Sequence, residues 1–294
     1  MRENGNILGY DDDPDMNGDQ YEDTRYHDIE LKGCSPVPLA HYLKALGIMK
    51  IVSSQLDNNV TGFWKDESFH LVISSNKTEL VDFFLEKYSP TPVVSPWNGG
   101  SGFSPSDYTD AIERISSSSD SRFIDYKDSV KNGINARNLM GIDKKVSKEQ
   151  KETILTLCRN IFPERALEWL DAAFVLTDSG VKYPPLLGTG GNDGRLDFSN
   201  NFMKNLVSMI LDNEDENSIG LLENSLFNKE INELTKSAIG QFFPYAAGGA
   251  NAIAGFDSDS KINPWDFIFM IEGSLLFAAS CSRKHQDTGN NALS

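Results

Sequence analysis

The chain has 294 residues, of which 39% are apolar, and a formal net charge of −16, which is enough material for one large or two smaller domains. Its three cysteines are scattered and none stands in a CxxC pair, so neither a zinc site nor a disulfide framework is indicated and a reducing cytoplasm is expected. The N-terminus lacks the pattern of a secretory signal. The longest apolar run, Pro264 to Cys281, contains Asp266 and Glu272 and is shorter than a membrane span of ~20 residues, so we expect a buried helix there and no membrane association.

The negative charge is concentrated at the N-terminus. Residues 1–30 carry ten carboxylates against Arg2 and Arg25, a net charge of −8. Few apolar residues accompany these charges, so we predict a disordered acidic tail over residues 1–25. We expect the remainder to divide into an N-terminal α+β part (26–118), a helical part with glycine-rich loops (119–284) and a second disordered tail (285–294).

The N-terminal part combines strands and helices. Apolar spacing predicts a strand, a β-hairpin and an amphipathic helix: Tyr26–Leu31, Thr61–Trp64 with Phe69–Ser74, and Pro38–Gln55. A second helix starts at a capping box formed by Asn76 and Glu79 and ends at Pro90. The segment from Pro90 to Phe103, rich in proline and glycine, is expected to form a structured, closely packed loop.

The second half of the chain reads as a series of helices. We predict helices over Ser106–Ile115, over Asp120–Leu139 and within Leu221–Ile239. Another helix should run from Pro163 to a stop at Gly180. Three further helices should start at a Ser147–Gln150 capping box, at an N-cap formed by Ser199, and at Asn263-Pro264. The predicted fold class is α+β, predominantly α-helical with a small β-hairpin or sheet element and glycine-rich loops between the helices.

The most basic window is Ser121–Lys151, where eight cations outnumber four carboxylates. It includes the adjacent pair Lys144 and Lys145. If a surface of this protein binds a phosphate backbone through charge, we expect it there. The alternative is an ordinary solvated helix face.

Three loops place two glycines beside an asparagine: Asn98-Gly99-Gly100, Gly190-Gly191-Asn192 and Gly248-Gly249-Ala250-Asn251. Arg195 adds a cation to the second loop, which leads into a helix. Asparagine both donates and accepts hydrogen bonds, and glycine permits close approach, so three converging loops would suit a polar polymer. Three unrelated turns are the alternative.

No catalytic motif is present. The four histidines are far apart and none stands in a metal-binding pattern, and no serine occupies a G-x-S-x-G elbow. We therefore expect neither an enzyme nor a metal or other cofactor.

Four long segments carry a specific pattern: LKGCSPVPLAHYLKALGIMKIV (Leu31–Val52), FFLEKYSPTPVVSPWNGGSGF (Phe83–Phe103), LLGTGGNDGRLDFSNNFMKNL (Leu186–Leu206) and GANAIAGFDSDSKINPWDFIFMIEGSLLFAAS (Gly249–Ser280). In this order they resemble the large-subunit family of the subtype I-G, formerly I-U, CRISPR effector complex, also known as csx-seventeen. Family members are usually longer, so the chain resembles an N-terminal portion.

The resemblance implies a non-catalytic subunit of an RNA-guided surveillance complex in prokaryotic antiviral defence, which helps to recognise the motif beside the target and to stabilise opened DNA. In such complexes base pairing reads most of the target, and protein reads the flanking motif and the backbone. The implied partners are the other subunits of the complex, guide RNA, target DNA and a helicase-nuclease recruited in trans, all in the cytoplasm.

The candidate nucleic-acid-binding residues come from the three loops and the basic window: Asn98, Gly99, Gly100, Gly190, Gly191, Asn192, Arg195, Asn251, Lys144 and Lys145. One rival hypothesis is an enzyme whose glycine-asparagine loops bind a nucleotide or sugar-phosphate, with Asp193 or Asp197 as general base. Another is a structural scaffold in which the loops pack against one another.

Overall fold

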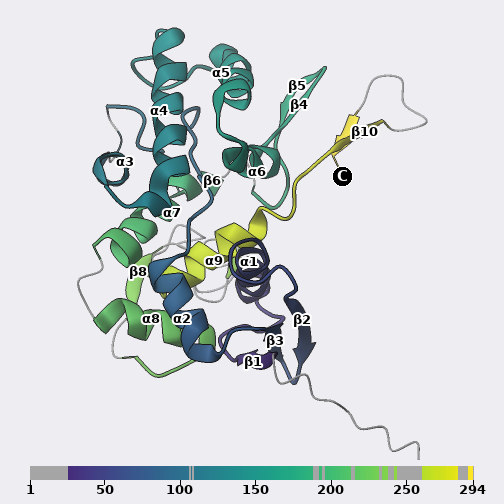
Figure 1. Ribbon diagram of the computed structural model, residues 1–294. Helices are drawn as coiled ribbons and strands as arrows, with labels where there is room; N and C mark the ends of the chain where they lie inside the picture. The colour runs from purple at the N-terminus through teal and green to yellow at the C-terminus, as the bar shows by residue number, and fades with distance from the viewer. Residues whose placement is uncertain are drawn as a thin grey trace, which may run out of the picture.

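The computed structural model describes residues 26–105, 107, 109–187, 192–193, 196–212, 216–231, 234–237, 242–243, 260–283 and 291–293. Within these ranges the chain is mostly helical, with one three-stranded sheet and several two-stranded antiparallel ladders (Figure 1). The predicted fold class, predominantly α-helical with a small β element, is thus confirmed. The predicted acidic tail, 1–25, lies outside the described residues.

The three-stranded sheet has the order β1-β3-β2 and is antiparallel throughout. Its strands are β1 (His27–Leu31), β2 (Thr61–Lys65) and β3 (Ser68–Ile73). In the turn between β2 and β3, Asp66 and Glu67 have φ angles of +47° and +66°, as a two-residue turn matched to the twist of the strands requires. The strand and the hairpin predicted from the sequence are confirmed.

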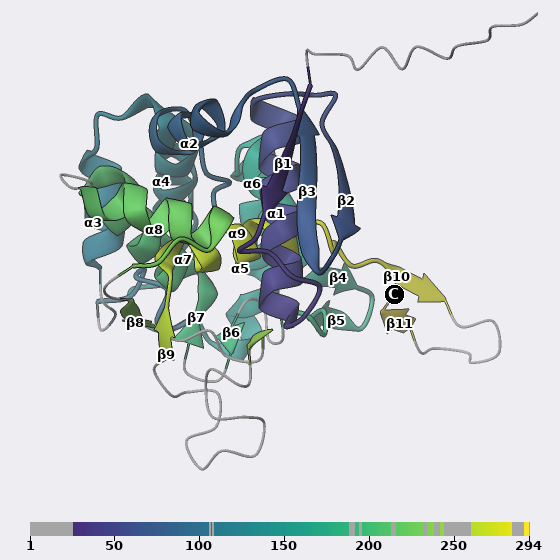
Figure 2. The same ribbon diagram turned by 90° about the horizontal axis from the view of Figure 1, so that it is seen from below.

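Two helices start where the spacing predicts them, although the second ends at Glu86 and not at the predicted Pro90. α1 (Leu39–Gln55) begins directly after Pro38 and lies against one face of the sheet (Figure 2), where Tyr42 stacks on Trp64. α2 (Lys77–Glu86) starts with the predicted capping box. The Asn76 side chain accepts from the N–H of Glu79 at 3.1 Å, and the Glu79 carboxylate accepts from the N–H of Asn76 at 2.8 Å.

A group of helices and a hairpin forms the next part of the chain: α3 (Asp110–Ser117), the 3₁₀ turn η1 (Ser121–Phe123), α4 (Ile124–Leu139), α5 (Lys148–Ile161), α6 (Glu164–Ala173), β4 (Val175–Thr177) and β5 (Gly180–Lys182). The capping box of Ser147 and Gln150 is formed in both directions. The helix predicted to run from Pro163 to Gly180 ends earlier, at Ala173. Gly180 has a φ of +99° in the β4–β5 turn, and because glycine suits both a helix end and a hairpin turn, the sequence does not separate the two.

The last part of the chain alternates short ladders with helices: β6 (Asn192–Asp193), β7 (Leu196–Asp197), α7 (Phe198–Leu206), the π-helical turn η2 (Val207–Leu211), α8 (Glu216–Phe227), β8 (Thr235–Ser237), β9 (Ser260–Ile262), α9 (Pro264–Ser274), β10 (Cys281–Arg283) and β11 (Asn291–Leu293). Two predictions need correction. Ser199 is the second residue of α7 and not its N-cap, and helix ends at Phe227 within Leu221–Ile239, so that β8 pairs with β9.

The predicted start of α9 is confirmed, because the Asn263 side chain accepts from the N–H of Trp265 at 3.0 Å. α9 then crosses α1 (Figure 1) at two glycines. A Cβ on Gly47 would overlap the carbonyl oxygen of Phe269, and a Cβ on Gly273 would overlap the carbonyl oxygen of Leu43. The two helices therefore touch backbone to backbone, which joins the first and the last helix of the described residues.

The loop between α2 and α3 is buried over residues 91–98, so its backbone needs partners from the protein. Side chains of α4 and α6 provide them, each donating to one loop carbonyl: Tyr126 Oη to Val93 at 2.9 Å, Arg137 to Pro96 at 2.9 Å and Trp169 Nε1 to Val94 at 3.0 Å. The prediction of a structured, closely packed loop is confirmed.

Among the helices of the described ranges, none combines the length and apolarity needed to cross a membrane.

Candidate nucleic-acid interface

The first glycine-asparagine loop comes to the surface where the buried segment ends. Asn98 is only 7% exposed, whereas Gly99 and Gly100 are exposed. The hydroxyl of Ser101 donates to the carbonyl of Asn98 at 2.7 Å. Asn98 therefore lies inside the base of the loop, and the two glycines present backbone to solvent.

The side chain of Asp107 closes this loop by accepting hydrogen bonds from backbone N–H groups of the loop. One carboxylate oxygen accepts from the N–H of Gly100 at 3.1 Å, and the other accepts from Gly102 at 3.1 Å and from Ser104 at 3.2 Å. The φ angles of +83° at Gly100 and +89° at Gly102 favour glycine at both positions. Backbone N–H groups that converge in this way can hold an anion, and here the protein's own carboxylate accepts from all three.

Arg137 of α4 joins the loop to the segment before α5. Its guanidinium is buried and donates to the carbonyl of Pro96 at 2.9 Å, to the hydroxyl of Ser104 at 3.3 Å and to the carbonyl of Lys144. Burial lowers the pKa of Arg137, and the carboxylate of Asp107 opposes that effect. A guanidinium stays charged in proteins, so its hydrogen bonds to these acceptors are charge-assisted.

Lys144 and Lys145 are both exposed beside the loop. A Cβ placed on Gly99 would lie 3.8 Å from Cε of Lys145. The structure thus brings together two predicted groups, the glycine turn and the lysine pair, that are far apart in the sequence.

The other two loops are described only at their edges. Gly190, Gly191 and Arg195 lie outside the described residues, as does Asn251, and Asn192 is placed only as the first residue of β6. α7, which follows β7, contacts the first loop, because Asn200 Nδ2 donates to the carbonyl of Gly100 at 2.7 Å.

Phe242, a described residue that precedes the third loop in the sequence, contacts α7. Phe198, the first residue of α7, packs on Phe242 with ring centroids 5.4 Å apart. Among the described residues, α7 thus contacts both the first loop, through Asn200, and Phe242, through Phe198.

Several cations of the basic window are used inside the fold. Arg122 pairs with Asp120 at 2.6 Å, and Lys127 donates to the carbonyl of Ser118 at 2.8 Å. Because Arg137 is also buried, the positive surface of this window is smaller than its composition indicates. Lys144 and Lys145 are the part of it that lies beside the loop.

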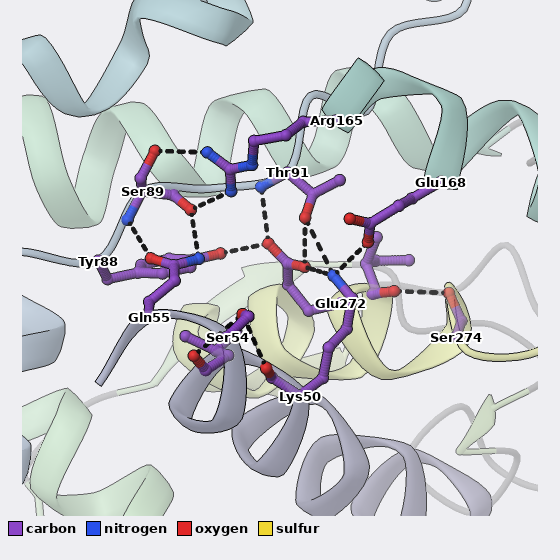
Figure 3. Close-up of polar contacts among 12 residues, drawn as sticks. Lys50, Ser54, Gln55, Tyr88, Ser89, Thr91, Arg165, Glu168, Glu272 and Ser274 are labelled. Carbon is purple, nitrogen blue, oxygen red and sulfur yellow. Dashed lines mark hydrogen bonds and ion pairs between the residues drawn. The ribbon is translucent and has the colours of Figure 1, made fainter. Parts of the chain in front are cut away.

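A second polar cluster lies in the core where α1, α6 and α9 meet (Figure 3). Glu272 is completely buried. Its carboxylate accepts from Tyr88 Oη at 2.7 Å, from the N–H of Thr91 at 2.9 Å, from Thr91 Oγ1 at 2.8 Å and from Lys50 Nζ at 2.9 Å. Lys50 also contacts the carboxylate of Glu168 at 2.7 Å. With four donors around it, Glu272 has no acceptor position left for a substrate.

The charge state of this cluster follows from the same contacts. Burial acts to raise the pKa of Glu272, but the Lys50 ammonium and the hydrogen bonds outweigh it and hold that pKa below its ordinary value. Burial likewise acts to lower the pKa of Lys50, and Glu272 and Glu168 together raise it. Both groups are therefore charged at neutral pH, and the cluster connects α1, α6 and α9.

A second ion pair also joins α1 to α9. Lys44 of α1 lies 2.8 Å from Asp266 of α9, and the hydroxyl of Ser225 donates to the same carboxylate oxygen at 2.6 Å. Lys44 and Lys50 stand on either side of Gly47 in α1, so charge pairs flank the glycine crossing.

The histidine of α1 has a serine partner but not the geometry of an activated nucleophile. His41 Nδ1 lies 2.9 Å from Ser35 Oγ, and the Ser35 hydroxyl donates to the carbonyl of Val37 at 2.7 Å. A hydroxyl has one proton, so His41 is the donor in this pair. Burial, with the nearby Lys44, lowers the pKa of His41 to about 4, so its ring is neutral at pH 7.

Sequence reasoning missed Asp107, Asn200 and the role of Arg137 at the loop. Nothing in their local sequence separates them from surface residues, because their partners are distant in the chain. Glu272 carried a signal, since a carboxylate within an apolar helix must be paired if it is buried.

Within the described residues, no group of three or more His, Cys, Asp or Glu side chains is arranged to hold a metal ion. No protein-family model matches the chain, and no curated protein matches it.

Proposed function

We propose that this chain is a non-catalytic large subunit of a type I CRISPR RNA-guided surveillance complex, of subtype I-G, and that it contributes to recognition of target DNA and its flanking motif in antiviral defence. The observation that carries this proposal is the mutual contact, in the fold, of the four segments on which the family resemblance rests.

These contacts involve all four segments. α1 from the first segment crosses α9 from the fourth at Gly47 and Gly273. The second segment contributes Tyr88 and Thr91 to the buried Glu272 of the fourth. The third segment meets the second where Asn200 donates to Gly100.

Contacts of this kind support the resemblance, because segments that share a core must keep compatible side chains together. The proposal also accounts for the cluster at Glu272, whose saturated hydrogen bonds suit a structural role.

The DNA-contacting surface in this proposal is the Gly99–Gly100 turn with Lys144 and Lys145. Ammonium groups neutralise phosphates, and a turn without side chains lets a backbone come close. Asp107 already occupies the N–H groups of Gly100, Gly102 and Ser104, so the lysines supply the attraction for DNA.

Substitution of the lysine pair tests this function. The variant Lys144→Ala/Lys145→Ala would be co-expressed with the other subunits of the complex and guide RNA, and binding of a duplex carrying the target and flanking motif would be measured over a range of salt concentrations. We expect the variant to co-purify, to bind DNA more weakly, and to reduce the slope of log K against log salt by roughly 0.9 for each phosphate that the lysines no longer neutralise.

The matched control is Lys65→Ala/Lys87→Ala, which removes two exposed lysines from other parts of the chain. We expect its DNA affinity and salt slope to stay close to those of the unaltered chain. Equal DNA binding by the test and control variants would contradict the proposed surface.

A further inference from the structure

We propose that Asp107 and Arg137 are positioning residues for the DNA contact. They hold the Gly99–Gly100 turn and the Lys144–Lys145 pair in one relative placement, and they do so without touching DNA. This inference rests on the proposed function of that surface and adds the groups that organise it.

Asp107 acts on the turn. Its carboxylate gathers the N–H groups of Gly100, Gly102 and Ser104 at 3.1–3.2 Å. These three donors lie within five consecutive residues, so one carboxylate determines the path of the loop over that stretch. An anion-binding position that a phosphate could occupy is filled from within the protein, so DNA meets a preformed turn in which these three N–H groups are already bonded.

Arg137 acts on the distance between the turn and the lysines. Arg137 is 4% exposed, and its guanidinium has acceptors on both sides: Pro96 and Ser104 on the loop, and the carbonyl of Lys144 on the other segment. A planar fork with five N–H donors can hold several acceptors at once, which the single ammonium of a lysine does not reproduce. The backbone of the lysine pair is thus tied directly to the loop.

The direction in which DNA affinity changes when Asp107 is substituted distinguishes a positioning role from a purely electrostatic one. Removing a carboxylate near a DNA-binding surface strengthens DNA binding if charge is all that matters, because the repulsion of phosphates decreases. If Asp107 positions the turn, the same substitution weakens DNA binding even though the surface becomes more positive.

The test uses Asp107→Asn in the assembled complex with guide RNA. We expect normal co-purification, a melting temperature close to that of the unaltered complex, and a loss of DNA affinity on the order of tenfold, which corresponds to about 1.4 kcal/mol. The salt slope should also decrease, because a displaced turn no longer presents the lysines together to the phosphates. Arg137→Lys, which keeps the charge and loses the fork, should weaken binding in the same way.

Asp128→Asn is the matched control, since Asp128 is an exposed carboxylate on α4 and its substitution changes the net charge equally. Its DNA affinity should equal or slightly exceed that of the unaltered complex. If Asp107→Asn binds DNA as tightly as this control does, the positioning role is overturned.

Failure of the proposed function would look different. If Lys144→Ala/Lys145→Ala leaves DNA binding unchanged, the DNA-contacting role of the surface is overturned. Amide hydrogen exchange at Gly100, Gly102 and Ser104 then tests the hold of Asp107 alone. Faster exchange in Asp107→Asn supports that hold, and unchanged exchange overturns it.

Discussion

Glu272 shows at the scale of one residue how a charge can be kept in a protein core. Its carboxylate accepts from Lys50, Tyr88 and twice from Thr91, so the loss of hydration is offset by an ion pair and by neutral donors together. Such an arrangement has little net effect on stability compared with an apolar core, but removing one partner is costly because the other charge is left buried.

Glu272→Gln should therefore destabilise the fold by about 3–5 kcal/mol, as measured by chemical denaturation. The amide turns an NH₂ group toward donors and leaves Lys50 without its buried counter-charge. Glu168→Gln is the control, because the Glu168 side chain is 44% exposed, and exposed pairs contribute about 0–1 kcal/mol. Equal losses of stability in the two variants would contradict this interpretation of the cluster.

The same carboxylate gives a pH dependence of definite sign. The pKa of Glu272 in the folded chain lies below its ordinary value of 4.5. Its contribution to stability is therefore complete above pH 4.5 and is lost as pH falls from there toward the folded pKa. Below pH 4.5 the free energy of unfolding should decrease more steeply with falling pH in the unaltered chain than in Glu272→Gln, and identical slopes would contradict the prediction.

Two cysteines provide a further test of the core. Burial raises the pKa of both the Cys34 and Cys158 thiols to about 12, so neither forms a reactive thiolate at pH 8. In a thiol-labelling assay on the native chain we expect at most one of the three cysteines to react, and all three to react after unfolding. Rapid labelling of two or more native thiols would contradict the burial of this pair.

At the scale of elements, local sequence patterns correctly predicted those helix starts that depend on interactions between neighbouring residues. The capping boxes at Asn76 and Ser147 and the Asn263-Pro264 start of α9 are each complete within a few residues, and all three are confirmed. The prediction that a helix stops at Gly180 was wrong. This glycine lies in the turn of the β4–β5 hairpin, and the spacing of apolar residues does not reveal that these strands pair. The crossing of α1 and α9 was likewise invisible, since it depends on Gly47 and Gly273 meeting across most of the chain.

Two glycine substitutions of opposite effect test that crossing. Gly47→Ala should destabilise the chain by about 3 kcal/mol or more, because its Cβ would overlap backbone that cannot move without separating the helices. Gly220→Ala in α8 should stabilise it by up to about 1 kcal/mol, because no atom lies within 4 Å of the new Cβ and alanine favours helix over glycine. Urea denaturation of both variants checks the difference, and a Gly47→Ala variant as stable as the unaltered chain would contradict the crossing.

At the scale of the whole molecule, the sequence indicated some residues of the candidate site but not their arrangement. The charge composition indicated Lys144 and Lys145 as candidate residues, and the glycine spacing indicated the turn at Gly99. Neither pattern predicted that the lysine pair lies beside this turn. The contact between the turn and the lysine pair depends on Arg137. In the sequence Arg137 looks like one more surface cation, whereas in the fold it is buried. Local periodicity carries no information about such pairings, because their acceptors are carbonyls of distant segments.

Co-purification tests most directly whether this chain is the DNA-contacting large subunit of a surveillance complex. The chain would carry an affinity tag and be co-expressed with the other subunits of a subtype I-G complex and guide RNA, and the purified assembly would be tested for binding to a duplex library randomised beside the target. We expect a stable assembly with motif-dependent DNA binding. Failure to co-purify, together with saturable binding of a free nucleotide by the isolated chain, would contradict the proposed function and favour a nucleotide- or sugar-phosphate-binding enzyme.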